Sequence, residues 1–109
     1  MIEITPIKGP INTTVTVPGS KSYTNRALIT AALAAGESTI TNALFSDDTR
    51  YMASSLNILG IPTEEKRDNN NFIIQGKGGV IPASHANLFV GNAGTAMRFL
   101  TALLTLGHG

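Results

Sequence analysis

The feature that most constrains the fold is a pattern that occurs twice in the chain. Residues 18–28 (PGSKSYTNRAL) align with residues 90–100 (VGNAGTAMRFL). Each segment follows a β-prone run, has a glycine turn and a small polar loop, and continues into a helix-forming stretch with an arginine in its second turn. A recurring unit of this kind predicts an α/β (α+β) protein built from repeated strand–helix units.

Short segments of alternating type fill the chain around these two copies. The expected strands are residues 2–4, 13–17, 38–42, 61–65, 72–75 and 88–90, and the expected helices are residues 23–35, a segment from Ser46–Asp48 to Gly60, and residues 95–106. The strands at 61–65 and 72–75 form a predicted hairpin across the polar turn 66–71. The order is βαβαββ followed by a new βα, so we expect an N-terminal piece of a longer protein whose second unit is unfinished at Gly109.

Composition excludes several classes of function. The chain has 109 residues, a formal net charge of +1 and no cysteine. It therefore lacks the basic excess that holds nucleic acid or a membrane surface, and it has no disulfide framework or thiolate metal site. Its most apolar stretch, residues 27–35, is much shorter than the ~20 residues of a membrane span, and no secretory signal opens the chain. We expect a soluble, cytoplasmic protein.

The first glycine-marked helix start gathers cations and hydroxyl groups. The first turn of a helix leaves backbone N–H groups without partners and carries partial positive charge, so it is a potential anion site. Lys21 adds a mobile charge there, Ser22 a hydroxyl, and Arg26 a planar fork suited to carboxylate or phosphate. An ordinary turn with a serine cap and two solvated cations explains the same spacing equally well. A P-loop is excluded because Ser20 stands where that motif requires glycine before the lysine.

The loop at the second glycine-marked helix start, residues 91–95, contains no charged side chain. Gly91 and Gly94 let the backbone approach a ligand closely, and Asn92 and Thr95 offer hydrogen bonds. The alternative is a left-handed turn with Thr95 capping the helix. For Arg98 we favour a structural role in which it bridges neighbouring carbonyl groups.

Other polar residues have simpler explanations. Asp47 and Asp48 fall in the first turn of the second expected helix, where carboxylates are stabilised by the helix dipole, so capping is favoured over metal or acid–base chemistry. His85 is isolated in a loop and His108 lies beside the last residue. Neither has the partners that a zinc site or a catalytic triad requires, and we expect no metal.

Taken together, three motif blocks, GSKSYTNRAL, SDDT and NAGTAMR, carry a specific resemblance. The stretches PGSKSYTNRALITAALAAGESTITNALFSDDTRYMASSLNILG and GNAGTAMRFLTALL resemble the N-terminal region of the 5-enolpyruvylshikimate-3-phosphate synthase family, from about Ile4 to Gly109. Members of that family transfer the enolpyruvyl group of phosphoenolpyruvate to the 5-hydroxyl of shikimate 3-phosphate, a late step towards chorismate and the aromatic amino acids. They use no cofactor and are typically monomeric.

The resemblance implies roles for several residues. Lys21, Ser22 and Arg26 match residues that contact shikimate 3-phosphate, and Lys21 also reaches phosphoenolpyruvate. Gly94 matches the glycine lining the phosphoenolpyruvate pocket, where the inhibitor glyphosate competes. Asn92, Thr95 and Asp48 are further substrate-binding candidates. The catalytic acid and base groups, and more phosphate-binding residues, are expected beyond Gly109, so this chain alone is expected to be inactive.

The same resemblance implies a domain organisation. The family fold has two domains, each built from three βαβαββ units as an inside-out α/β barrel. Residues 1–109 then form part of the N-terminal domain: residues 13–76 are the first unit, residues 86–109 start the second, and residues 1–12 hold a strand that belongs with the C-terminal domain. We expect the isolated chain to expose apolar faces around Met97, Leu100 and Leu104 and to self-associate.

One position departs from the family pattern, and two other interpretations stay open. Many members have proline where this chain has Phe99. The first alternative is a fragment of the related UDP-N-acetylglucosamine enolpyruvyltransferase, whose motifs fit less well. The second is a non-catalytic anion-binding or folding module.

Overall fold

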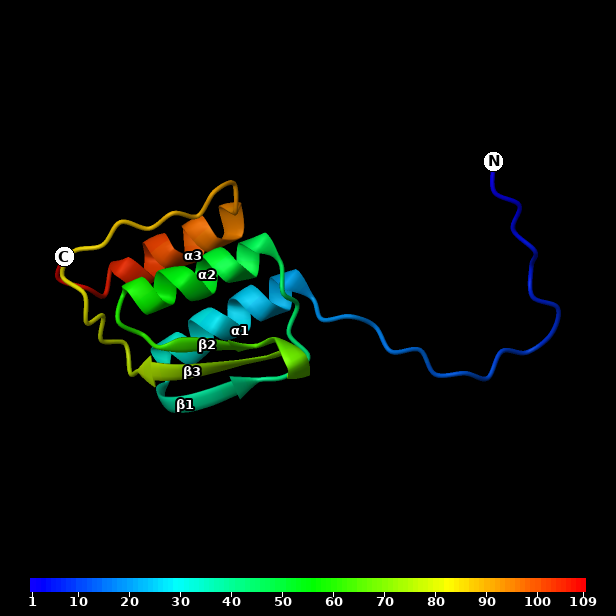
Figure 1. The fold of residues 1–109 in the computed structure, drawn as a ribbon, viewed down its shortest axis with the longest axis horizontal. Coiled ribbons are helices and arrows are strands. Elements are labelled where there is room, and N and C mark those ends of the chain that lie inside the picture. The colour runs from blue at the N-terminus through cyan, green and yellow to red at the C-terminus, as the bar shows by residue number, and fades with distance from the viewer.

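The computed structural model describes residues 1–109 and consists of a folded body with a long N-terminal arm (Figure 1). Residues 1–18 are exposed and have no secondary structure. The arm raises the radius of gyration to 17.7 Å, whereas a compact chain of this length has a value of about 13 Å. All regular structure therefore lies between Lys21 and Leu104.

The first helix, α1 (Lys21–Leu33), begins two residues earlier than the sequence predicts. Ser20 is its N-cap and accepts a hydrogen bond from the Tyr23 amide at 3.4 Å. The helix ends at Leu33, before the predicted Ala35. Gly36, with φ +94°, lies inside the following strand, β1 (Ala35–Ile40).

The second helix, α2 (Asp47–Ile58), has the ends that the sequence predicts. At its start Ser46 and Thr49 form a reciprocal capping box. At its end Gly60 adopts φ +84°, and the Ile61 amide donates to the Leu56 carbonyl at 2.9 Å in a Schellman arrangement.

The predicted hairpin is confirmed, with strands β2 (Thr63–Lys66) and β3 (Asn71–Lys77). The short 3₁₀ turn η1 (Arg67–Asn69) joins them, and Asn70 supplies the expected positive φ at +52°. Both β1 and β2 pair antiparallel to β3, which gives the strand order β1-β3-β2. The outer edges of β1 and β2 are therefore open.

Helices α1, α2 and α3 (Gly94–Leu104) run side by side, with their N-terminal ends at the same end of the body (Figure 1). Helix α1 packs on β1 and β3, α2 packs on β2, and α3 lies against α1 and α2. The core between these layers is made of fully buried side chains, of which the largest are Phe72, Leu28, Met52, Leu56, Leu59, Ile61 and Ile74. The mixed α/β architecture predicted from the sequence is confirmed. None of the helices has the length and apolar character needed to cross a bilayer.

Three predicted strands are wrong. Residues 2–4, 13–17 and 88–90 have no strand pairing. A strand needs a neighbour for its backbone hydrogen bonds, and none of these segments has one. Leu88 and Val90 instead pack as extended chain against the core, whereas Val15 and Val17 remain exposed in the arm.

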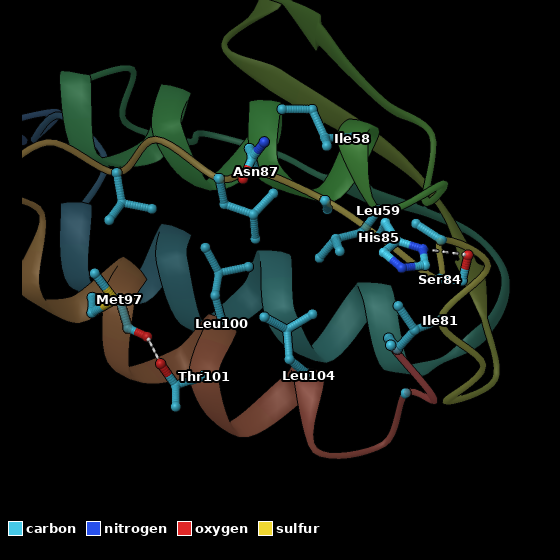
Figure 2. A pocket seen from close by; sticks show the side chains of 16 residues that line it. Ile58, Leu59, Ile81, Ser84, His85, Asn87, Met97, Leu100, Thr101 and Leu104 are labelled. Carbon is cyan, nitrogen blue, oxygen red and sulfur yellow. Dashed lines mark hydrogen bonds between the residues drawn. The ribbon is translucent and has the colours of Figure 1, made fainter.

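An apolar groove of about 820 Å³ runs between α2, α3 and the segment 81–90 (Figure 2). Met97 and Leu104 line it and are 53% and 39% exposed, as expected from the sequence. The expectation was wrong for Leu100, which is 2% exposed because it is part of the hydrophobic core.

These exposed faces predict that the isolated 109-residue chain associates with itself. Burying apolar area yields about 25 cal/mol per Å², so the groove and the apolar residues of the arm favour contact between copies. We expect the sedimentation coefficient and the unfolding midpoint to rise with protein concentration. Serine at positions 97 and 104 should weaken this dependence. A monomer with a sharp, concentration-independent unfolding transition would contradict the prediction.

Candidate functional site

The candidate site lies where the three helices begin (Figure 1). Each helix start leaves first-turn amides without intrahelical partners and adds partial positive charge. Helices α1 and α2 each use one serine cap, Ser20 and Ser46, whereas α3 has no side-chain cap. Parallel helix starts at one end of the body make this end suited to an anionic ligand.

Lys21 and Asp48 connect the starts of α1 and α2. The Lys21 Nζ lies 3.1 Å from the Asp48 Oδ2, and the Lys21 side chain is still 51% exposed. Both aspartates lie in the first turn of α2, as the sequence predicts, but the side-chain cap is Ser46 and not either aspartate. Asp48 instead holds Lys21, and Asp47 lies 3.7 Å from Arg50 on the outer side of α2. Lys21 is thus fixed at the site and remains accessible to a ligand.

Arg26 connects the starts of α1 and α3. Its Nη1 donates to the Ser22 carbonyl at 3.2 Å and to the Ser22 hydroxyl. Its guanidinium lies 6.0 Å from the centroid of the Phe99 ring, at the outer limit of a cation–π contact. Lys21, Ser22 and Arg26 therefore all lie within the first two turns of α1, as the sequence predicts, and the first helix start carries both cations.

At the second helix start the backbone is open to solvent. Gly91 has φ +52° and lies against the Tyr51 ring, so a side chain there would clash. Asn92 and Gly94 are exposed, and Thr95 is partly exposed. The alternative in which Thr95 caps the helix is wrong, because α3 begins at Gly94 without any side-chain cap.

Arg98 is a cation at this second start to which sequence analysis assigned only a structural role. It makes no side-chain hydrogen bond or ion pair in the structure, so the bridging role favoured from the sequence is not observed. A Cβ placed on Gly94 would lie 3.6 Å from the Arg98 Nη1. The signal that could have identified Arg98 is its spacing, because residues four apart share a helix face.

The His85 side chain has one hydrogen-bond partner, the hydroxyl of the neighbouring Ser84, 3.2 Å from Nδ1. It lines the apolar groove rather than the helix starts (Figure 2). The candidate site is therefore defined by Lys21, Ser22, Arg26 and Asp48 at one side and by the backbone of residues 92–95 at the other.

The structure is a mixed α/β architecture in which three helices begin at one end of the body, beside the cations Lys21 and Arg26. Residues 5–109 match the family model of EPSP synthase (3-phosphoshikimate 1-carboxyvinyltransferase), and the chain belongs to this family. It is similar to the 3-phosphoshikimate 1-carboxyvinyltransferase of Trichormus variabilis, at 54% identity over 99% of this chain and 25% of the relative. The corresponding protein of Shewanella denitrificans is 55% identical over 94% of this chain and 23% of its own length.

A solved structure agrees with the sequence comparisons. EPSP synthase from Acinetobacter baumannii matches with a TM-score of 0.75 and 32% identity, over 83% of this chain and 20% of that protein. The chain thus spans about a quarter of the length of the curated relatives it matches. These names favour the EPSP synthase interpretation over the UDP-N-acetylglucosamine enzyme and over a non-catalytic module.

Proposed function

We propose that the full-length protein transfers the enolpyruvyl group of phosphoenolpyruvate to the 5-hydroxyl of shikimate 3-phosphate and releases phosphate, in the cytoplasm. The observation that carries this proposal is the pairing of Lys21 with Asp48 at the shared helix starts, in a chain of the EPSP synthase family. Both substrates carry a phosphate and a carboxylate, which require cations and free amides of the kind found here.

In this proposal the first helix start binds shikimate 3-phosphate. Arg26 and Ser22 hold its anionic groups by charge-assisted hydrogen bonds, and Lys21 lies between the two substrates. The open backbone at Gly94 receives phosphoenolpyruvate, with Asn92 and Thr95 beside it. Lys21 would stabilise the charge that develops as phosphate leaves the tetrahedral intermediate.

The domain organisation belongs to the same proposal. We propose that residues 13–76 form one βαβαββ unit, that residues 86–109 start the next, and that residues 1–12 join the C-terminal domain. Two observations support this assignment: the outer edge of β1 is open, and Gly19 packs against residues 42–44, just beyond the end of β1. In the full-length protein, residues 13–17, which lead into Gly19, can therefore pair with this edge as a strand parallel to β1.

The direct test is an assay of phosphate release by the full-length protein. Release should require both shikimate 3-phosphate and phosphoenolpyruvate, with the enolpyruvyl ether of shikimate 3-phosphate as the organic product. Turnover with UDP-N-acetylglucosamine in place of shikimate 3-phosphate, or release without an acceptor, would contradict the proposal. Titration of the 109-residue chain with shikimate 3-phosphate, followed by NMR, then asks whether Lys21, Ser22, Arg26 and Gly94 already form a binding surface in this part.

Gly94→Ala is expected to lower phosphoenolpyruvate affinity without harming the fold. The added Cβ meets only the Arg98 Nη1, at an ordinary contact distance of 3.6 Å, and Gly94 does not have a positive φ. The methyl group would occupy space at the open helix start, and one methyl group is worth roughly tenfold or more in discrimination. The KM for phosphoenolpyruvate should rise by about that factor, while the KM for shikimate 3-phosphate and the unfolding midpoint stay near wild type. An unchanged KM for phosphoenolpyruvate would remove Gly94 from the site.

A further inference from the structure

Asn25 is a buried polar residue beside the site that neither the proposed function nor the core explains. Its side chain is 0% exposed, and neither Oδ1 nor Nδ2 has a hydrogen-bond partner. Buried amide groups are normally paired, because an unpaired one costs about 1–3 kcal/mol. The other side chain in this condition is Ser55, through its hydroxyl.

Helical geometry places Asn25 at the junction of the three helices. It is four residues after Lys21, which contacts Asp48 of α2, and directly before Arg26, which contacts Phe99 of α3. Residues four apart share a face, and each residue is rotated by about 100° from the next. Asn25 therefore projects between the α2-facing and α3-facing sides of α1, one turn below Lys21.

The start of α3 lacks a side-chain hydrogen-bond acceptor for its first-turn amides. Its N-cap is Ala93, which has no side-chain oxygen to accept from the first turn. Thr95 and Ala96 have no hydrogen-bond acceptor for their amides, and Ala96 is 0% exposed. Ala96 is three residues before Phe99 and so shares the face of α3 that meets α1. Asn25 on α1 thus has an unpaired buried acceptor, and the buried residue Ala96 has an unpaired amide on the face of α3 that meets α1.

We propose that Asn25 is a positioning residue that caps α3 across the helix interface, its Oδ1 accepting from the Ala96 amide. The structure does not contain this bond, because Oδ1 has no partner there, so the start of α3 must move closer to α1 to make it. Once made, the bond fixes the backbone of Gly94 relative to Lys21. Its effect on substrate binding rests on the proposed function, whereas the bond itself does not.

A purely structural Asn25 makes the opposite prediction. Leucine has nearly the same shape, and exchanging an unpaired buried amide for an apolar group is neutral or stabilising. In that case Asn25→Leu should leave ligand affinity unchanged. Asp at this position keeps the acceptor, and the partial positive charge at the start of α3 offsets part of the cost of burying a carboxylate. Asn25→Asp is therefore the conservative variant that should rescue a capping function.

The experiment compares Asn25→Leu, Asn25→Asp and Ser55→Ala in the full-length protein. Ser55 is the matched control, because its hydroxyl is also buried and unpaired but lies seven residues, about 10 Å, along α2 from Asp48. Two quantities are measured: hydrogen exchange at the Ala96 amide without ligand, and the KM for each substrate.

We expect Asn25→Leu to raise the hydrogen-exchange rate of the Ala96 amide by about tenfold or more, and to raise the KM for phosphoenolpyruvate by a similar factor. Loss of a helix N-cap has effects of this size. The KM for shikimate 3-phosphate should change much less, and Asn25→Asp and Ser55→Ala should resemble wild type. Unchanged exchange and KM in Asn25→Leu, or the same losses in Ser55→Ala, would overturn the proposal.

Two further outcomes are also decisive. If Asn25→Leu fails to fold, the wild-type and Asn25→Asp proteins still test the hydrogen bond between residues 25 and 96. An Ala96 amide that exchanges in either protein as fast as an unstructured amide would exclude this bond. If wild type binds neither substrate, the proposed function fails, while Ala96 protection still reports on Asn25.

Discussion

Replacing Lys21 by methionine in the full-length protein is expected to lower kcat/KM by roughly 1,000-fold, the scale on which a lost transition-state charge contact acts. Methionine keeps the unbranched stem but removes the ammonium that reaches the site from the start of α1. It also leaves Asp48, 3.1 Å from that ammonium, without its counter-ion, so an uncompensated carboxylate would face anionic substrates. Steady-state phosphate release with both substrates measures the effect.

Two variants separate the causes of this loss. Arg50→Met removes an exposed cation whose partner, Asp47, is on the outer side of α2, and kcat/KM should stay within about twofold of wild type because surface pairs contribute little. Lys21→Met combined with Asp48→Asn removes both charges. If this double variant regains wild-type rates, Lys21 serves only to neutralise Asp48. Wild-type rates in Lys21→Met itself would remove Lys21 from the site.

The ends of α2 and the first cluster of cations were predictable because they depend on neighbouring residues. Ser46 and Thr49 close a capping box within one turn, and Gly60 ends α2 through its own positive φ. The spacing of Lys21, Ser22 and Arg26 places them on adjacent turns of one helix for the same local reason.

The errors concern contacts between distant segments. Alternating threonine and valine at residues 13–17 is typical of a strand, but a strand forms only where another strand accepts it, and that choice is not local. The same reason applies to residues 88–90, which pack on the core without pairing.

The composition of the site shows the same limit. From the local sequence, capping was favoured for Asp48, and only the family resemblance made it a substrate-binding candidate, because nothing near it in the chain indicates that the loop after β1 brings α2 beside Lys21. Likewise, nothing in the local sequence indicates that the Phe99 ring lies beside Arg26.

The close packing behind Lys21 leads to the second large effect, which is expected for Gly19→Ala. A Cβ at Gly19 would meet the backbone of residues 42–44, with the Leu44 nitrogen at 2.7 Å and the Asn42 carbonyl oxygen nearer still. Backbone atoms cannot turn aside as a flexible side chain can, so α1 must move. The hydrogen bond from the Leu44 amide to the Thr24 hydroxyl, now 3.0 Å, would lengthen. We expect unfolding to become easier by about 1–3 kcal/mol, as for other overpacked sites.

The same displacement should reduce activity beyond what stability explains. Moving α1 carries Lys21 away from Asp48, and a shift of about 1 Å in a positioning group costs roughly 100-fold in rate. Denaturant unfolding and kcat/KM, both measured where the variant is still folded, test the two effects. Gly78→Ala is the control, because its added Cβ meets only the Ala35 Cβ, at an ordinary distance of 3.7 Å. Its φ of +62° should cost about 1–2 kcal/mol of stability for a purely local reason, while kcat/KM of the folded variant stays near wild type. If kcat/KM of folded Gly19→Ala is also near wild type, the contact between Gly19 and residues 42–44 does not set the position of Lys21.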